Sequence, residues 1–333
     1  MPSANVTQYG DVSPRIGMVA AAKMLAHAQP VIVLSKMGQT RPMPKNKGQT
    51  IKFRRPVPFE PATTALTEGV APASQKMVYE DVQVSLDQYG AWVEITDVIE
   101  DTHEDPVLND ASMLCGEQAA DTIESLVYGV LRAGTAVGYA NGSARTAVNT
   151  VISLNKQRMV TRTLKGQRAK KLTSILDGSI KINTTPIEAS YIAVGHTDLE
   201  PDIRGLPGFT PVAEYGSRQP ICPEEVGTVE DVRYVLSPML DPFEDAGGAA
   251  GSMLSTSGTN ADVYPILYFA KDAFGVVPLK GKESIKPMIL QPNTPRGGDP
   301  LGQLGSVAWK TWHASLILNQ AWMYRLEVAA TDL

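Results

Sequence analysis

The sequence is poor in cysteine and has no long apolar run. Its two cysteines, Cys115 and Cys222, lie too far apart to supply the clustered ligands of a zinc knuckle or an iron–sulfur site. No stretch of about 18 apolar residues occurs, and the most apolar candidate, residues 17–34, is interrupted by charged and polar side chains and by Pro30. We therefore expect neither a structural metal nor a membrane span.

An excess of positive charge is also missing. The 333 residues carry a formal net charge of −5, whereas proteins that bind nucleic acid over their whole surface are rich in Lys and Arg. Any DNA contact is therefore expected to be local and weak. The 43% of hydrophobic residues is ordinary for a globular protein of one large or two smaller domains. A secretion signal begins with a basic segment that is followed by an apolar one, whereas here Asp11 precedes the first apolar stretch. We therefore expect synthesis in the cytoplasm.

Catalytic motifs are absent as well. The four histidines, His27, His103, His196 and His313, are dispersed, and neither a G-x-S-x-G elbow nor a Walker-type phosphate loop occurs. His103 with its acidic neighbours lacks the H-E-x-x-H spacing of a metal site, and Asp105 before Pro106 indicates a helix start instead. We expect no catalytic residue, metal or cofactor.

What the sequence does contain begins with a ribbon of two strands. Apolar and polar residues alternate around Ile51 and Phe53 and again around Val82 and Val84, on either side of a proline-rich connection. The first strand lies in a basic stretch, since no acid occurs between residues 41 and 59. Its six cations are Arg41, Lys45, Lys47, Lys52, Arg54 and Arg55. We favour pairing of these cations with acidic patches of a neighbouring copy, such as residues 100–105 or 224–231, over DNA contact or a merely solvated face.

A very long helix follows. Apolar residues recur every three or four positions from Pro106 to Ala133, where Gly134 ends the pattern. At 1.5 Å per residue this helix would be about 42 Å long, and no other helix of matching length is evident. It is therefore expected to act as a spine against which a sheet lies. A short amphipathic helix is predicted near the N-terminus, from Ser13 to Pro30, and residues 91–99 read as a strand that leads into a helix.

The remainder reads as a mixed region of helix and strands. The pattern predicts a helix over residues 152–176, an exposed and mobile loop over 246–260, and five strands, over 190–195, 230–236, 263–270, 306–318 and 322–329. A second basic group lies on and just after the predicted helix, with no acid between residues 125 and 176. It comprises Lys156, Arg158, Arg162, Lys165, Arg168, Lys170 and Lys171. DNA, a neighbouring copy and solvent are all open as its partner.

Several short segments, in the same order along the chain, resemble the major capsid proteins of tailed bacteriophages, in the podophage branch of the Hong Kong 97-type capsid fold family. These segments are Thr64–Val70, Trp92–Val98, Asp105–Leu108, Gly116–Ala120 and Asp299–Gln303, with Trp309 and Lys310. The resemblance covers nearly the whole chain. It implies an α+β fold with four parts. These are an N-terminal arm (1–40), an E-loop (41–89), a P-domain (90–150 and 301–333, with the spine helix at about 106–133) and an axial A-domain (151–300).

The resemblance also implies a function and partners. A protein of this family is a coat subunit that forms hexamers and pentamers, with each E-loop lying across a neighbour, and builds the icosahedral head around double-stranded DNA. The implied partners are other copies of the chain, a scaffolding protein, a portal protein, a decoration or cement protein and the packaged DNA. About 40 residues precede the E-loop, too few for a fused scaffolding domain, so the scaffold is expected to be a separate protein. The lysine-to-asparagine crosslink of the type member has no matching pair here, so non-covalent contacts are expected.

Three alternatives remain open at this point. The same fold could form an encapsulin-like nanocompartment shell that encloses enzymes. A soluble enzyme would require some of the scattered His, Asp and Glu residues to converge on one pocket. A DNA-binding regulator would show a steep salt dependence of binding through the basic segments.

Overall fold

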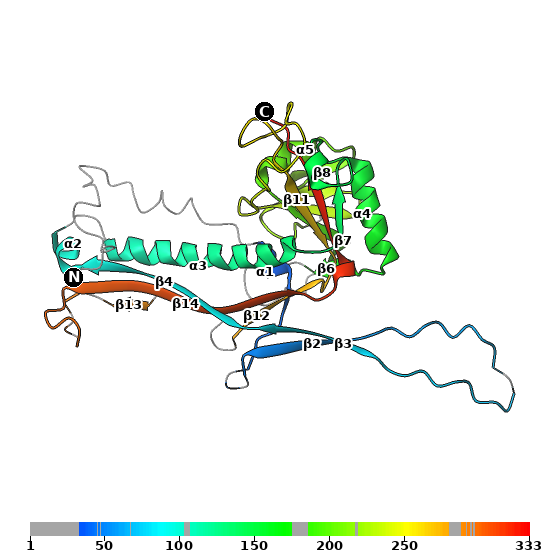
Figure 1. Ribbon diagram of the computed structural model, residues 1–333, viewed down its shortest axis with the longest axis horizontal. Helices are drawn as coiled ribbons and strands as arrows, with labels where there is room; N and C mark the ends of the chain where they lie inside the picture. Colours follow the sequence, from blue (N-terminus) through cyan, green and yellow to red (C-terminus); the bar gives the residue numbers. More distant parts are fainter. Residues whose placement is uncertain are drawn as a thin grey trace.

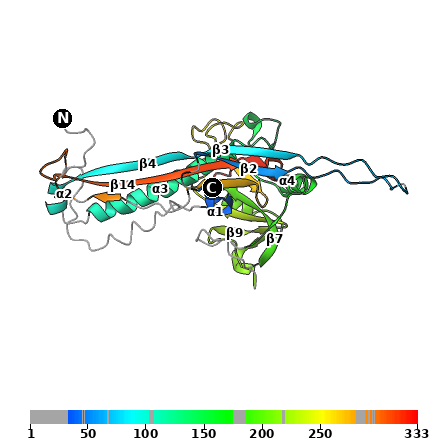
Figure 2. The ribbon, with the colours of Figure 1, turned by 90° about the horizontal axis from the view of Figure 1, so that it is seen from below.

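The computed structural model describes residues 33–44, 46, 48–66, 68–102, 107–174, 186–216, 219–279, 288–290, 292–293, 295 and 297–333. The described chain is elongated. A long helix lies along a pair of long strands, a compact domain sits at one end of this arm, and a β-ribbon projects from beneath that domain (Figure 1). The view from below shows the ribbon and the long strands following each other along the molecule's longest axis (Figure 2).

The helices differ greatly in length. They are α1 (Leu34–Met37), α2 (Asp97–Thr102), α3 (Val107–Arg132), α4 (Leu154–Gly166) and α5 (Glu200–Arg204), with four 3-10 turns, η3 (Arg145–Ala147), η4 (Thr197–Leu199), η5 (Val212–Glu214) and η6 (Gln320–Trp322). The predicted spine helix is confirmed as α3, whose 26 residues span about 39 Å. The predicted helix of residues 13–30 lies outside the described residues.

The arm is built on a five-stranded sheet. Its strands are β1 (Gln39–Thr40), β4 (Asp87–Thr96), β12 (Phe274–Pro278), β13 (Met288–Leu290) and β14 (Leu304–Ile317). β14 is central: it pairs antiparallel with β4 over ten residues, and also with β12 and β13. Cys115 and Ala119 of α3 pack on Ile95, Val307 and Trp309, so one stripe of the helix and one face of the β4–β14 pair form a shared core.

The compact domain holds an eight-stranded mixed sheet, with the order β5-β15-β11-β7-β10-β9-β8 and with β6 paired to β7. The strands are β5 (Val137–Tyr139), β6 (Leu172–Ser174), β7 (Pro186–Gly195), β8 (Phe209–Pro211), β9 (Glu225–Val229), β10 (Val232–Leu236), β11 (Tyr264–Phe269) and β15 (Met323–Val328). Val160 and Leu164 of α4 cover one face of this sheet. There the hydroxyl of Tyr234 donates to the Gln157 Oε1, 2.8 Å away, so the buried tyrosine keeps a hydrogen bond.

The second face of the compact sheet receives the end of the spine helix. Val127 and Leu131 of α3 pack with Val194 and Leu267 in one core, which also includes Leu34 of α1. Glu124 of α3 is fully buried beside them. Its carboxylate accepts hydrogen bonds from the backbone amides of residues 33, 34 and 35, at 3.0, 2.7 and 3.4 Å. Glu124 therefore caps α1, whose first amides would otherwise lack acceptors.

The α+β class is confirmed, but several predicted boundaries are wrong. The helix predicted over 152–176 ends at Gly166, because Arg168 adopts a left-handed backbone with φ of 54° and the chain then enters β6. The strand predicted over 230–236 starts only at Val232, because Glu230 (φ 52°) and Asp231 form the tight turn after β9. The strand predicted over 91–99 ends at Thr96, where α2 begins. The strands predicted over 263–270, 306–318 and 322–329 are found as β11, β14 and β15.

The loop predicted over 246–260 is held by two aspartates. Asp245 accepts hydrogen bonds from the amide and hydroxyl of Ser257, at 3.0 and 2.7 Å. Asp262 accepts from the Asp245 amide at 2.7 Å and from the Thr256 hydroxyl at 2.9 Å. Leu254 also packs against the core of the compact domain, and Gly247 and Ala250 are buried, so the loop is not exposed throughout as predicted. Its Gly- and Ser-rich sequence did not reveal these polar bonds. Its mobility stays a prediction.

Candidate assembly surfaces

The ribbon consists of β2 (Thr50–Pro56) and β3 (Tyr79–Ser85), paired antiparallel from Thr50 with Ser85 to Pro56 with Tyr79. Among the described residues, its base alone is anchored to the rest of the chain. Phe53 is buried there against Leu86, Val277 and Leu316, next to β12 and β14. An isolated two-stranded ribbon is marginally stable in water, so this small core is what fixes the direction in which the ribbon projects.

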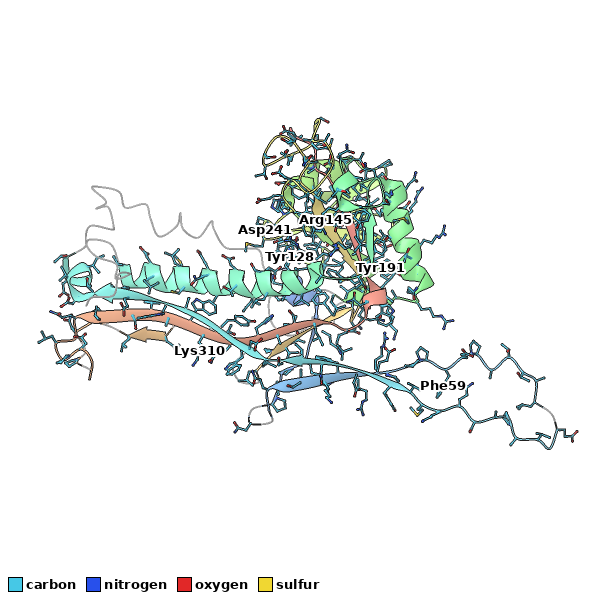
Figure 3. All side chains as sticks on the ribbon, in the orientation of Figure 1. Phe59, Tyr128, Arg145, Tyr191, Asp241 and Lys310 are labelled. Carbon is cyan, nitrogen blue, oxygen red and sulfur yellow. The ribbon has the colours of Figure 1, made fainter. Side chains whose placement is uncertain are left out.

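Beyond its base the ribbon continues as an extended loop, residues 57–78, that is exposed over its whole described length. Phe59 lies near its beginning (Figure 3) and is 55% exposed. Leu66, seven residues further along the chain, is 76% exposed. Other large apolar side chains exposed in this segment are Val57, Val70, Met77 and Val78. So many apolar side chains gathered on one projecting loop are typical of a surface that another chain covers.

The basic residues of the ribbon are partly neutralised within it. Arg54 forms a two-pronged ion pair with Asp81 on the opposite strand, at 2.8 and 3.0 Å, and this hydrogen bonding lowers the pKa of the Asp81 carboxyl. Arg55 pairs with Glu80, also on the opposite strand, through one terminal nitrogen. Arg41 lies over the ring of Phe53. Of the other predicted site residues, Lys52 lies on β2, and Lys45 and Lys47 fall outside the described residues.

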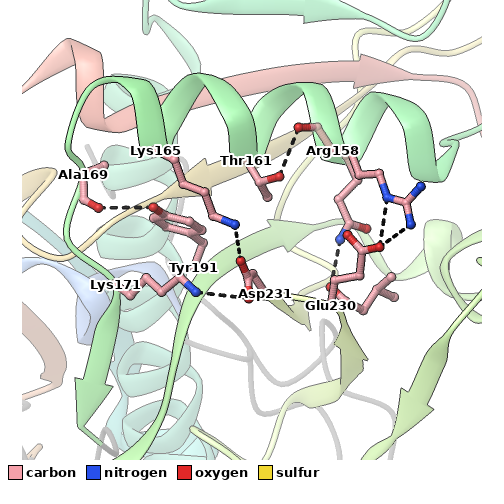
Figure 4. Close-up of polar contacts among 10 residues, drawn as sticks. Arg158, Thr161, Lys165, Ala169, Lys171, Tyr191, Glu230 and Asp231 are labelled. Carbon is pink, nitrogen blue, oxygen red and sulfur yellow. Dashed lines mark hydrogen bonds and ion pairs between the residues drawn. The ribbon is translucent and has the colours of Figure 1, made fainter.

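The second basic group lies on and after α4, and about half of it is tied to a single turn. The two-residue turn between β9 and β10 presents Glu230 and Asp231 to the helix (Figure 4). Arg158 binds Glu230 at 2.9 Å, while Lys165 and Lys171 both bind Asp231, the latter at 3.1 Å. The hydrogen bond from Lys165 lowers the pKa of Asp231. The acidic turn that we expected to meet a neighbouring copy is therefore engaged within its own chain.

The rest of the α4 group is less constrained. Lys156 donates to the carbonyl of Tyr139 at 2.8 Å. Arg162, Arg168 and Lys170 have no acidic partner in the described parts of the chain. These three are the cations of the group that remain available to DNA or to another subunit.

A further apolar surface lies on the arm, on the face of the sheet turned away from α3. Trp92 of β4, Ala308 of β14 and Met288 of β13 form one row across three strands, because their registers coincide. Trp92 is 62% exposed and Met288 50% exposed. Since Val307 and Trp309 point toward α3, the alternation of β14 places this row on the opposite side. Sequence reasoning missed this surface, although Trp92 lies in one of the segments that carry the resemblance.

The structure offers little for catalysis. Within the described residues no group of His, Cys, Asp and Glu side chains could hold a metal ion. His196 lies beside Asp198, with the Asp198 amide donating to its Nδ1 at 3.1 Å, and His313 is buried on β14. His27 and His103 fall outside the described residues. None of the helices described here is long and apolar enough to cross a membrane.

The projecting ribbon, the spine helix laid along a long strand pair and the compact mixed domain at one end define a Hong Kong 97-type capsid fold. Solved structures of the same shape support this class. The capsid of Ralstonia phage GP4 matches with a TM-score of 0.68 over 99% of this chain and 96% of its own, at 13% identity. The capsid of Cyanophage Pam1 matches with a TM-score of 0.61 over the full length of both chains, at 12% identity.

The sequence comparison then gives the family. Residues 79–326 match the phage capsid protein family, and the chain belongs to it. Among curated proteins, the major capsid protein of Pseudomonas phage KPP21 is 21% identical over 207 residues, which cover 58% of this chain and 52% of that protein. The chain thus aligns with about half the length of that curated relative.

Proposed function

We propose that this chain is the major capsid protein of a tailed bacteriophage, which assembles as hexamers and pentamers into the icosahedral head around double-stranded DNA. The observation that carries this proposal is the loop of residues 57–78, which exposes several large apolar side chains and, within the described residues, is held at the base of its ribbon alone. Such a loop is expected to be stable only when another subunit covers it. Membership of the phage capsid family supplies the second support.

The proposal extends to the parts and partners of the shell. It assigns residues 1–40 to an arm, 41–89 to the E-loop, 90–150 and 301–333 to a P-domain, and 151–300 to an A-domain. Strands cross between the last two parts, because β12 and β13 complete the sheet of the arm and β5 and β15 enter the compact sheet. During assembly the chain would contact a separate scaffolding protein. In the virion it would contact a portal protein and a decoration protein. It would have no enzymatic activity. The relatives named above are phage capsids, so an encapsulin-like nanocompartment is not favoured.

The basic groups receive different roles. On the ribbon, Arg54 and Arg55 already face acids of the opposite strand, so their proposed role is to keep the ribbon straight beside a neighbour. On the compact domain, Arg162, Arg168 and Lys170 are proposed to make the weak contacts with DNA or with an adjacent subunit. Because few cations are available per subunit, each subunit would bind DNA weakly and in a salt-dependent way.

The test is electron microscopy of the purified full chain, with and without a co-expressed scaffold, compared with a variant that carries Phe59→Ser and Leu66→Ser. Both side chains are exposed in the free chain, so the variant should fold with unchanged thermal stability but should no longer form closed shells or capsomer rings. Leu333→Ser is the matched control, because Leu333 is 95% exposed and lies away from the ribbon. A wild-type chain that stays a monomer under all conditions, or a variant that assembles normally, would contradict the proposal.

A further inference from the structure

Three arginines from distant parts of the sequence meet where α3 joins the compact domain. Arg132 is the last residue of α3, Arg145 begins η3, and Arg325 lies in the middle of β15. They line a pocket of about 440 Å³. Figure 3 shows Arg145 gathered there with Tyr128 and Asp241, in the angle between the helix and the domain.

The acids of this pocket do not balance its cations. Glu327, which is fully buried, holds Arg145 through two bonds of 2.7 and 2.8 Å, and it also contacts the Nε of Arg325 at 2.9 Å. One carboxylate therefore serves two guanidinium groups. Burial, and the nearby charge of Arg145, lower the pKa of Arg325, while Glu327 opposes this. Arg132 has no acidic ion-pair partner in the part of the chain described. Glu327 lies behind the pocket, and Asp241 is the one acid among the lining residues.

An aromatic ring fixes the orientation of two of these arginines. The guanidinium carbon of Arg145 lies 3.4 Å from the centre of the Phe243 ring, and that of Arg132 lies 3.8 Å from it. Two guanidinium groups cannot stand so close on one face, so they flank the ring on opposite sides. Stacking leaves the N–H groups at their edges free to bind. Arg145 uses its Nε and one terminal nitrogen to bind Glu327. Arg132 hydrogen-bonds the hydroxyl of Tyr128 and contacts no carboxylate of the described residues, so most of its five donors stay available.

The pocket walls indicate the kind of anion that fits. Beside the arginines they include apolar surface from Ala133, Met239 and Phe243. A Glu or Asp side chain brings its own methylene groups to such a wall while its carboxylate meets the planar donors of arginine. The backbone of a DNA duplex is a convex, hydrated surface, which reaches the rim of a concave pocket and not its interior.

We propose that this pocket binds a carboxylate side chain of an acidic polypeptide segment, supplied either by a second copy of this chain or by a different acidic protein. The site goes beyond the proposed capsid function and does not depend on it. Arg132 is its principal ligand, because its guanidinium is oriented by Phe243 and unpaired by acid, while Arg145 and Arg325 add positive charge from the opposite wall.

The first arm of the test measures binding of a fluorescein-labelled hexaglutamate peptide to the unassembled full chain by fluorescence anisotropy at low salt. Arg132→Gln should weaken binding about tenfold or more, since it removes charge-assisted hydrogen bonds. Arg132→Lys should weaken it less, because the charge stays but the planar fork is lost. Arg204→Gln, which removes an exposed arginine of α5 that pairs with Glu200, is the matched control and should leave binding unchanged. Thermal melting of each variant checks that the fold is intact.

The second arm identifies the source of the carboxylate by sedimentation velocity of the chain alone. Weaker self-association of Arg132→Gln would assign the carboxylate to a second copy, and unchanged self-association with lost peptide binding would assign it to a different acidic protein. Peptide binding equal in the wild type and Arg132→Gln would overturn the site. A duplex oligonucleotide that binds as tightly as the peptide, and is weakened to the same extent by Arg132→Gln, would overturn its selectivity for carboxylates.

Discussion

At the scale of single residues, His313 on β14 is a buried group whose charge state depends on pH. Its side chain is 5% exposed, and its Nε2 has no hydrogen-bond partner within the described chain. Burial lowers the pKa of His313 from its ordinary 6.5 to about 4. The unfolded chain therefore binds a proton on this residue at a higher pH than the folded chain does, so acid favours unfolding.

This difference predicts a loss of stability between neutral and mildly acid pH. From the two pKa values, His313 should lower the free energy of unfolding by about 2 kcal/mol between pH 7 and pH 5. His313→Leu should remove this contribution and flatten the pH dependence. Urea unfolding of the unassembled chain at both pH values measures it. Equal slopes for the variant and the wild type would show that the pKa of His313 is not lowered in the folded chain.

Glu124 allows a second prediction at this scale. Glu124→Ala removes both acceptor oxygens, so the buried amides of residues 33 and 34, which share Oε1, lose their acceptor at a cost of roughly 1–3 kcal/mol each. Hydrogen exchange at the amides of residues 33–35 should become much faster. Glu117→Ala, on the same helix but only partly buried, is the matched control. Retained protection at these amides in Glu124→Ala would contradict the capping role.

At the scale of elements, two acids that anchor secondary structure should contribute very different amounts to the free energy of unfolding. Asp231 in the β9–β10 turn binds Lys165 and Lys171 on a partly exposed surface, where ion pairs contribute about 1 kcal/mol or less. Glu327 on β15 is fully buried between two arginines, and breaking such a pair costs about 3–5 kcal/mol. Denaturant unfolding of Asp231→Asn and Glu327→Gln should show this difference. Similar losses of unfolding free energy in both variants would mean that burial does not determine how much these ion pairs stabilise the fold.

The elements also show what the sequence could predict. The spine helix and the ribbon follow local periodicity, so their patterns were sufficient to find α3, β2 and β3. The pairing of Arg54 with Asp81 could have been predicted by aligning the two ribbon strands so that their apolar residues face each other. Contacts such as Arg145 with Glu327, 182 residues apart, leave no local pattern. The pocket of three arginines and the row that contains Trp92 were missed for this reason.

At the scale of the whole molecule, the exposed loop of residues 57–78 should report on assembly. Lys76 is the single Lys or Arg in this segment, and it is exposed. Trypsin should therefore cleave after Lys76 rapidly in the unassembled chain and many times more slowly in shells, where a neighbour covers the loop. Mass spectrometry of timed digests measures both rates. Equal rates in free chain and shells would mean that the loop stays uncovered.

The order of synthesis adds a consequence of the way β14 and β15 are placed. β14 is the central strand of the arm's sheet, and β15, reached after the short turn η6, lies between β5 and β11 in the compact sheet. A ribosome must therefore translate residues 304–328 before either sheet can close, since each lacks an inner strand until then. A nascent chain that still lacks these residues cannot present the folded surface of the arm or of the compact domain. Subunit association on the polysome is thereby delayed until both strands have left the ribosome.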